Sequence, residues 1–218
     1  MKEIPSRVEA TKYLCDFMHT VSGDVIIGGH SKGGDLATFA FKHLPPELQP
    51  RIIHTYSIDG PTSIKTKHLH LQDRITKLVP QTSLIGIIMD RSKKFQVVKS
   101  TADFMEQHNP FTWCVADDDF DYLPQTDKFS KIMQESLISW QTELSPTIKK
   151  YFINSLFKAV NKTGSTSVNE FTKHWQQNVF TIFKISLHQP IETRKVWRNV
   201  SGKFVKCLIS STSKHAFR

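Results

Sequence analysis

The sequence has few cysteines and no long hydrophobic run. Cys15, Cys114 and Cys207 lie far apart in the 218 residues and fit no metal-binding or redox spacing. No stretch approaches the roughly 20 apolar residues of a membrane span, and the first residues lack the apolar core of a signal peptide. No two histidines four residues apart flank a glutamate. We therefore expect reduced thiols, a cytoplasmic location, no metal and no cofactor.

Acidic residues are scarce in the C-terminal part. Residues 124–218 hold 15 Lys and Arg against 5 Asp and Glu, whereas residues 1–123 hold 14 against 15. The net charge of +9 therefore belongs to the C-terminal part. A basic surface of this kind can meet an anionic membrane or nucleic acid, or it can be a solvated helix face. No recognised nucleic-acid-binding motif accompanies it, so we expect no nucleic-acid partner and keep a peripheral membrane contact open.

One segment has the pattern of a strand, a tight turn and a helix. The β-branched run Val25–Ile27 leads into Gly29-x-Ser31-x-Gly33, and small and apolar residues follow at helical spacing. This pattern is typical of a nucleophile elbow, in which a strained turn projects a serine hydroxyl from a sheet and glycines let strand and helix approach. The helix N-terminus then offers the backbone N–H of Lys32 to an oxyanion. The alternative is a glycine-rich turn without a catalytic role.

Hydrophobic periodicity predicts an α/β core in residues 1–123. A helix over residues 6–20 precedes the elbow strand, and further strands are expected within 51–61, 74–80 and 94–100. The core is therefore expected to be part of a doubly wound sheet, from the elbow strand onward. The apolar segment Ser83–Met89 is too short to span a membrane, so we expect it to line a pocket or to pack in the core.

Residues 124–218 are expected to form a basic helical extension packed on that core. Ser145-Pro146 predicts a capped helix start with proline at the first helical position. Ser167–Glu170 has the form of a capping box that opens another helix, and a last helix is expected from about Ile191. These helices are amphipathic and carry aromatic residues, which predicts a side bundle. The alternative is an interfacial membrane anchor.

A serine nucleophile needs a base and a third group that orients the base, in the chain order Ser, acid, His. His108 lies in a loop just past the last predicted strand, where the histidine loop of such a sheet belongs. The other histidines lie in strands, connections or the helical region, and His30 is expected to shape the elbow. His108 is therefore the candidate base, with an ordinary loop histidine as the alternative.

Three carboxylates compete for the role of the acid. Asp59 ends the second predicted strand, on the same carboxyl edge as the elbow, where open α/β sheets bind ligands. The position after the next strand, Val79–Ser83, holds no carboxylate. We favour Asp59, with Asp90 and Asp103 left open. The alternative for Asp59 is that it only stabilises the turn at Gly60-Pro61.

Four motifs follow one another along the chain. They are Gly-His-Ser-Lys-Gly-Gly at 29–34, Ile-Asp-Gly-Pro at 58–61, Val-Pro-Gln-Thr-Ser at 79–83 and Gln-His-Asn-Pro-Phe-Thr-Trp at 107–113. Together they resemble an uncharacterised bacterial group of lipase-like α/β-hydrolases, and the helical tail is similar to that group's C-terminal region. The resemblance covers nearly the whole chain. It implies a hydrolase fold and a Ser31/His108 pair, and it supplies no known substrate.

Members of that group carry a preceding segment with early strands and a loop resembling Phe-Arg-Gly-Thr, whereas the first helix here begins near Ser6. The resemblance therefore implies that the elbow strand is an edge strand. It also implies that the second oxyanion donor is absent, and such a loss typically costs about 10²–10³ in rate. We expect a truncated chain, a split-gene fragment, or a subunit completed by a complementing N-terminal fragment. The resemblance thus leaves open two consequences for an isolated chain of this kind, loss of activity and a tendency to aggregate.

The sequence thus predicts a serine hydrolase of esterase or lipase type that acts on an ester or lipid-like small molecule. Ser31 would attack the carbonyl, His108 would act as base and then as acid, and Asp59 would orient the imidazole. Four aromatic residues suit an acyl pocket and equally suit a core: Phe95, Phe104, Phe111 and Trp113. The alternative is a non-catalytic hydrolase-like scaffold that binds a partner or an anionic membrane surface through its basic helices.

Overall fold

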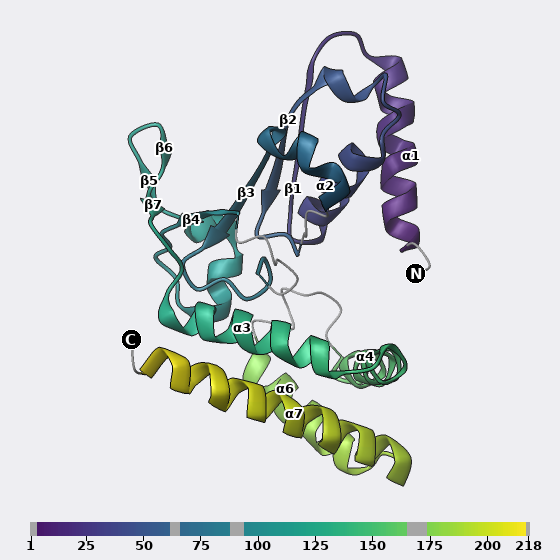
Figure 1. The fold of residues 1–218 in the computed structure, drawn as a ribbon, viewed down its shortest axis with the longest axis vertical. Coiled ribbons are helices and arrows are strands. Elements are labelled where there is room, and N and C mark those ends of the chain that lie inside the picture. Colours follow the sequence, from purple (N-terminus) through teal and green to yellow (C-terminus); the bar gives the residue numbers. More distant parts are fainter. Residues whose placement is uncertain (1–3, 62–65, 88–93, 165–173, 217–218) are drawn as a thin grey trace. The chain divides into compact units, whose positions relative to one another are not determined.

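The computed structural model describes residues 4–61, 66–87, 94–164 and 174–216. The chain divides into two compact units, Met1–Ser130 and Lys131–Arg218. The first unit combines helices with a mostly parallel sheet, and the second is helical (Figure 1). The predicted α/β core with a helical C-terminal region is therefore confirmed at this level. The division falls inside helix α3 (Lys128–Glu143) rather than before it.

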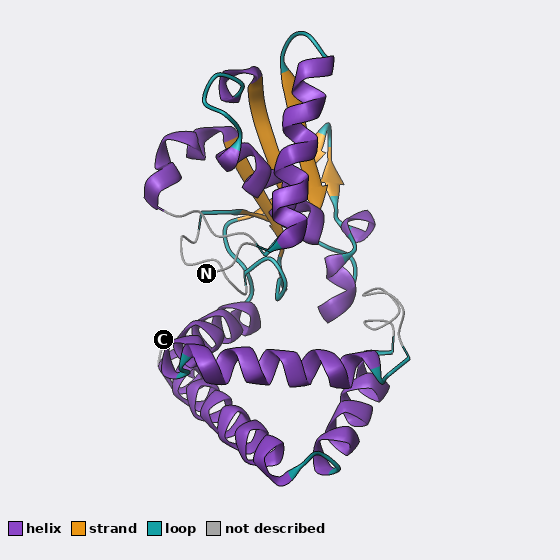
Figure 2. Ribbon diagram, turned by 90° about the vertical axis from the view of Figure 1, so that its right-hand side faces the viewer, coloured by secondary structure: helices purple, strands orange, loops and turns teal. Residues whose placement is uncertain are grey.

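Among the described residues, the main sheet of the first unit has five strands in the order β1-β2-β3-β4-β7 (strands are orange in Figure 2). Four of them run parallel: β1 (Val25–His30), β2 (Ile52–Ile58), β3 (Ile75–Pro80) and β4 (Gln96–Val98). The short strand β7 (Tyr122–Leu123) is antiparallel to β4, and a separate hairpin joins β5 (Val115–Ala116) to β6 (Asp119–Phe120). The predicted strands are confirmed, and among the described strands β1 lies at an edge of the sheet, as expected.

Two helices cover one face of this sheet. Helix α2 (Lys32–His43) packs on β1 and β2, and α1 (Pro5–Thr20) packs against α2. Apolar side chains from both helices meet the strands in one core, made of Leu14, Met18, Ala40, Phe41, Leu44, Ile52 and Leu71. Because burial of apolar surface is the main favourable term in folding, this core holds the elbow between β1 and α2 in place.

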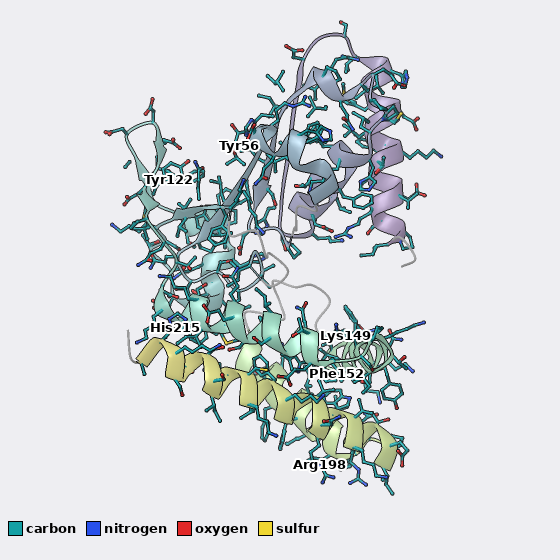
Figure 3. All side chains as sticks on the ribbon, in the orientation of Figure 1. Tyr56, Tyr122, Lys149, Phe152, Arg198 and His215 are labelled. Carbon is teal, nitrogen blue, oxygen red and sulfur yellow. The ribbon has the colours of Figure 1, made fainter. Side chains whose placement is uncertain are left out.

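The opposite face of the sheet is more open. Side chains alternate between the two faces of a strand, so Val25 and Ile27 pack toward the helices while Ile26 is 58% exposed. A hollow of about 660 Å³ lies on this open face, and its lining residues include Tyr56 and Tyr122 (both are labelled in Figure 3). The described part of the first unit also contains four 3₁₀ segments: η1 (Gln49–Arg51), η2 (Thr66–Arg74), η3 (Phe104–His108) and η4 (Pro110–Thr112).

Within its described residues, the second unit contains most of α3 together with α4 (Pro146–Asn161), α6 (Trp175–Leu187) and α7 (Ile191–Ala216). The predicted cap of α4 is confirmed, because the Ser145 hydroxyl oxygen accepts a hydrogen bond of 3.3 Å from the Ile148 N–H. The predicted last helix begins at Ile191. The predicted capping box Ser167–Glu170 lies outside the described residues.

Aromatic side chains form the interior of the second unit. Trp140 contacts Phe152 and Phe204 edge to face, and Phe152 contacts Trp197 in the same way. The indole N–H of Trp140 also donates to the Val200 carbonyl at 2.9 Å, which satisfies its polar atom. Among the described helices, none is both long enough and apolar enough to cross a membrane.

Candidate active site

Ser31 occupies a strained turn between β1 and α2. Its φ of 54° and ψ of −122° are unusual for a residue with a side chain. The turn is held by its own backbone, because the Ser31 N–H donates to the Ile58 carbonyl at 2.8 Å and the Ser31 carbonyl accepts from the Gly34 N–H at 3.1 Å. Such strain persists only where the surroundings impose it. The predicted strand, turn and helix are therefore confirmed as geometry.

The glycines of the motif have different roles. A Cβ on Gly29 would overlap the backbone of Gly33, and a Cβ on Gly34 would lie 2.8 Å from the Gly29 carbonyl oxygen. Gly29 and Gly34 thus allow β1 and α2 to approach more closely than side chains would permit. A Cβ on Gly33 would meet no atom within 4 Å. Close approach of strand and helix therefore requires the first glycine of Gly-x-Ser-x-Gly and not the last.

Parallel pairing brings the ends of β1, β2 and β3 to the same edge of the sheet. His30 pairs with Ile58, and Ile58 pairs with Leu78. Ser31 and Asp59 each follow one of these strands, so both lie at the carboxyl edge, where open α/β sheets place their ligands. Asp59 has a φ of 43° and is 1% exposed. Sequence reasoning predicted this shared edge correctly.

Asp59 and His108 are in direct contact. The Nδ1 atom of His108 lies 2.7 Å from Oδ2 of Asp59, and both side chains are buried. An ionised carboxylate only accepts hydrogen bonds, so Nδ1 of His108 is the donor in a contact with such a carboxylate, and in the neutral imidazole Nε2 is then the acceptor. His108 is the last residue of η3, and the contact joins residues 49 positions apart in the chain.

The second oxygen of Asp59 has two donors of its own. Its Oδ1 accepts from the Ser83 hydroxyl at 2.6 Å and from the Gly86 N–H at 3.0 Å. The carbonyl of Gly86 in turn accepts from the ammonium group of the buried Lys77, at 2.6 Å. These bonds fix the carboxylate, so that Oδ2 faces His108. A Cβ on Gly86 would overlap Oδ1 of Asp59.

The loop that carries His108 is attached to the end of β3 through Gln107. The Gln107 amide oxygen accepts from the Thr82 N–H at 2.9 Å, and its amide nitrogen donates to the Ala102 carbonyl at 2.9 Å. The Gln107 carbonyl accepts from the indole N–H of Trp113 at 2.8 Å. Gln107 is 3% exposed. Its bonds therefore hold the backbone next to His108 in one position.

His30 connects the elbow to His108. Its Nε2 lies 2.7 Å from the His108 carbonyl oxygen, and the centroids of the two rings are 4.5 Å apart. Burial lowers the pKa of His30, and the hydrogen bond to His108 offsets this only in part. His30 is therefore neutral at neutral pH, with its proton on Nε2 because a carbonyl only accepts. This agrees with its expected role in shaping the elbow.

The structure places Ser31 and His108 in one neighbourhood without a direct bond between their side chains. His30 precedes Ser31 in the chain and touches the His108 ring. Within the described part of the chain, the Ser31 hydroxyl and Nε2 of His108 have no hydrogen-bond partner. Both groups are thus available to a substrate, and in ligand-free enzymes the nucleophile and base often come together only when substrate binds.

Lys32 is the first residue of α2, so its backbone N–H cannot bond within the helix. Within the described residues this N–H has no acceptor, and the positive end of the helix dipole adds to its attraction for an anion. The Lys32 ammonium lies 2.5 Å from Asp35, which Arg7 of α1 also contacts through two nitrogen atoms. The side-chain charge is therefore partly neutralised, and the backbone remains the candidate oxyanion donor.

The four aromatic residues proposed for an acyl pocket do not form one. Phe111 is 95% exposed, and Trp113 packs in a core with Leu78 and Val98. Phe104 does line a small recess beside Asp59 and His108. Leu84 and Ile85 also line it, whereas Ile87 is buried in the interior, so the expectation for this apolar segment is confirmed over residues 83–87.

Asp103 and His54 are less well placed than Asp59 and His108. Asp103 is exposed at the start of η3 and makes no contact with His108 among the described residues, and Asp90 lies outside those residues. His54 lies within β2, where it contacts the hydroxyl of Thr76 at 2.8 Å. The described residues contain no group of three or more His, Cys, Asp or Glu side chains that could hold a metal ion.

Sequence reasoning missed Ser83, which hydrogen-bonds to Asp59, and Asp35, which connects α2 to α1. Ser83 was noted only within a motif without a carboxylate, yet its hydroxyl binds Asp59. Asp35, which is 2% exposed, was not singled out. Burial alone would raise the pKa of Asp35, but its hydrogen bonds with Arg7 and Lys32 outweigh this and lower it. The sequence signal that could have identified Asp35 is a carboxylate within an otherwise apolar helix face, because a buried carboxylate is normally paired.

A family model described as Mbeg1-like matches residues 1–158 of the chain. The search of curated proteins found no match. The search of solved structures found none either.

Proposed function

The chain belongs to the Mbeg1-like family, and we propose that this member is a serine hydrolase that cleaves esters through an acyl-enzyme. The observation that carries the proposal is the bond of 2.7 Å between His108 and Asp59, at the sheet edge where Ser31 occupies its strained turn. Serine, acid and histidine follow one another in the chain order of α/β-hydrolases. We also propose that β1 to β4 correspond to part of the sheet of a lipase-like α/β-hydrolase.

The first half-reaction forms the acyl-enzyme. Nε2 of His108 takes the proton of the Ser31 hydroxyl while Oγ attacks the ester carbonyl, and Asp59 stabilises the imidazolium. The carbonyl oxygen becomes an oxyanion that accepts a hydrogen bond from the Lys32 N–H. The tetrahedral intermediate then collapses. The bond to the leaving alkoxide breaks, and the alkoxide takes the proton from His108 and departs as an alcohol.

The second half-reaction restores the enzyme. His108 removes a proton from water, the resulting hydroxide attacks the acyl carbon, and the oxyanion again accepts from the Lys32 N–H. Collapse releases a carboxylic acid, and Ser31 recovers its proton from His108. The Lys32 N–H is the one oxyanion donor assigned here. Turnover is therefore expected to be about 10²–10³-fold slower than in an enzyme with a complete oxyanion hole. The proposed substrate is an ester or lipid-like small molecule.

Hydrolysis of a short p-nitrophenyl ester tests the proposal. Three proteins are compared: the wild type, Ser31→Ala and the matched control Ser22→Ala, which changes an exposed serine before β1. We expect Ser31→Ala to lose all hydrolysis above the rate of free imidazole, while Ser22→Ala keeps the rate of the wild type. Equal hydrolysis by Ser31→Ala and the wild type would refute the assignment of the nucleophile.

A further inference from the structure

A groove lies between α6 and α7 in the second unit. Its volume is about 690 Å³, and its apolar lining includes Val179, Ile182, Phe183, Leu187 and Ile191. Four of these residues lie along α6, which ends at Leu187, and Ile191 is the first residue of α7. The groove is therefore formed by α6, α7 and the turn between them (the α6–α7 hairpin), and its lining residues among those that the structure describes all belong to the second unit.

The apolar side chains of this hairpin face solvent, although the unit has a separate interior. Phe183 is 57% exposed, Leu187 is 53% exposed and Ile191 is 62% exposed. Trp140 and Phe152 pack with Trp197 and Phe204 in the aromatic interior, and Trp197 also lines the groove. Phe183, Leu187 and Ile191 therefore lie beside this aromatic cluster and take no part in its ring contacts. A contiguous exposed apolar surface rimmed by polar groups is typical of an interaction site.

Basic side chains border the same groove. Arg194 and Arg198 lie one helical turn apart on α7, so they project on one side of it, and both are exposed (Arg198 is labelled in Figure 3). Within the described residues neither guanidinium has an ion-pair or hydrogen-bond partner. Lys195 also lines the groove and pairs with Glu192 at 3.1 Å. The two arginines leave an uncompensated positive charge beside the apolar floor.

The exposed apolar residues and the two arginines together indicate which kind of ligand the groove binds. The positive charge of the two arginines favours an anionic ligand, and the apolar residues of the groove favour contact with alkyl chains. A helix surface with Phe and Leu on one side and Lys and Arg beside them is typical of helices that lie in a membrane interface. A nucleic acid would engage the charges and leave the exposed Phe183, Leu187 and Ile191 in water. The remaining surface also favours an anionic partner, since residues 124–218 hold 15 basic and 5 acidic residues.

We propose that the α6–α7 hairpin docks on a bilayer surface that contains anionic phospholipid. Phe183, Leu187 and Ile191 insert among the acyl chains, and Arg194 and Arg198 bind phosphate groups of the lipid headgroups. This site goes beyond the proposed hydrolase activity and does not depend on it.

Vesicle sedimentation tests the docking surface with the full chain. The vesicles are made of phosphatidylcholine alone or of equal parts phosphatidylcholine and phosphatidylglycerol, at low and at high salt. We expect binding to the anionic vesicles, and weaker binding at high salt because charged groups near the surface are screened. Two outcomes would refute the proposal: equal binding to both kinds of vesicle, or no binding to the anionic ones.

Paired variants distinguish this groove from general basic charge. Arg194→Gln with Arg198→Gln is expected to weaken partitioning to anionic vesicles about 30-fold, since each basic residue near the surface adds about 1 kcal/mol. The control, Lys158→Gln with Lys162→Gln, removes the same charge at the same spacing from the exposed end of α4. It is expected to change partitioning little. An equal loss of partitioning in the two double variants would refute the proposal that this groove is the membrane-binding site.

A further variant tests whether the apolar residues of the groove insert into the membrane. Phe183→Gln with Leu187→Gln keeps the net charge and good helix formers, and helicity measured by circular dichroism checks that α6 remains folded. We expect this variant to lose sedimentation with anionic vesicles at moderate salt. Unchanged binding by a folded variant would show that the arginines act without insertion, and would overturn the proposed mode of docking.

Discussion

Nδ1 of His108 lies 2.7 Å from Oδ2 of Asp59, and both residues are buried at the carboxyl edge of the sheet. The other carboxylate oxygen is held by Ser83 and Gly86, so the carboxylate has little freedom to turn away. The imidazole is therefore fixed in one tautomer and one orientation. This is the arrangement that a catalytic base requires, and it defines which substitutions should affect catalysis more than stability.

Asp59→Asn is expected to lower kcat by about 10⁴. The amide oxygen can still accept from Ser83 and Gly86, but its NH₂ group would then face Nδ1 of His108. The imidazole must accept at Nδ1 and carries its proton on Nε2, where it cannot take the Ser31 proton. Steady-state kinetics with an ester substrate give the result. A loss of less than about tenfold would show that Asp59 only stabilises the turn.

Ser83→Ala is expected to lower kcat with little change in KM. The variant removes one charge-assisted hydrogen bond from a buried carboxylate, which costs about 1.5–3 kcal/mol and lets Asp59 shift relative to His108. Ser130→Ala is the control, because its equally buried hydroxyl donates to the Ser83 carbonyl and does not touch Asp59. Both variants should lose stability in urea unfolding. A similar fall in kcat for both would contradict a specific role of Ser83.

Gly29→Ala and Gly33→Ala form a matched pair at the elbow. A Cβ on Gly29 would overlap the Gly33 backbone, so the first variant is expected to lose about 1–3 kcal/mol or more of unfolding free energy. The second adds a methyl group in open space near the start of a helix, and the change is expected to be at most about 1 kcal/mol. Urea unfolding measures both. Equal destabilisation would contradict the close approach of β1 and α2.

Asp35→Asn is expected to destabilise the first unit by about 1.5–3 kcal/mol at neutral pH, because it removes the charge of a buried carboxylate that accepts hydrogen bonds from Arg7 and Lys32. Since the folded-state pKa of Asp35 is lowered, its contribution to stability is full above the unfolded value of about 3.9. The contribution is lost as pH falls through the lower folded pKa. Unfolding free energies of wild type and variant should thus converge in acid. A difference that does not vary with pH would contradict this.

The sequence was informative where structure is local. The Gly-x-Ser-x-Gly turn, the start of α4 at Ser145 and the strands are determined by neighbouring residues, so periodicity and turn chemistry predicted them. The shared edge of Ser31 and Asp59 also followed, because consecutive parallel strands end on the same side. The pairing of Asp59 with His108 could be proposed from chain order, but its distance could not.

Other features depend on contacts between distant segments. Ser83 and Gly86 hold Asp59 across 24 and 27 residues, and no local pattern specifies that packing. The burial of the aromatic residues after His108 could not be predicted from the sequence either. Phe111 lies in η4 and faces solvent, whereas Trp113, two residues later, is buried. Aromatic composition therefore could not distinguish a pocket wall from a core residue or an exposed one.

The most direct test of the central claim is the intact mass of the chain after incubation with a fluorophosphonate, followed by peptide mapping. The phosphonate reacts with a serine that a neighbouring base activates, so labelling does not require complete turnover. We predict one adduct, located on Ser31, that is absent from Ser31→Ala and formed much more slowly by His108→Asn. A folded wild-type chain that gains no adduct while a known serine esterase is labelled, or an adduct on another residue, would contradict the account.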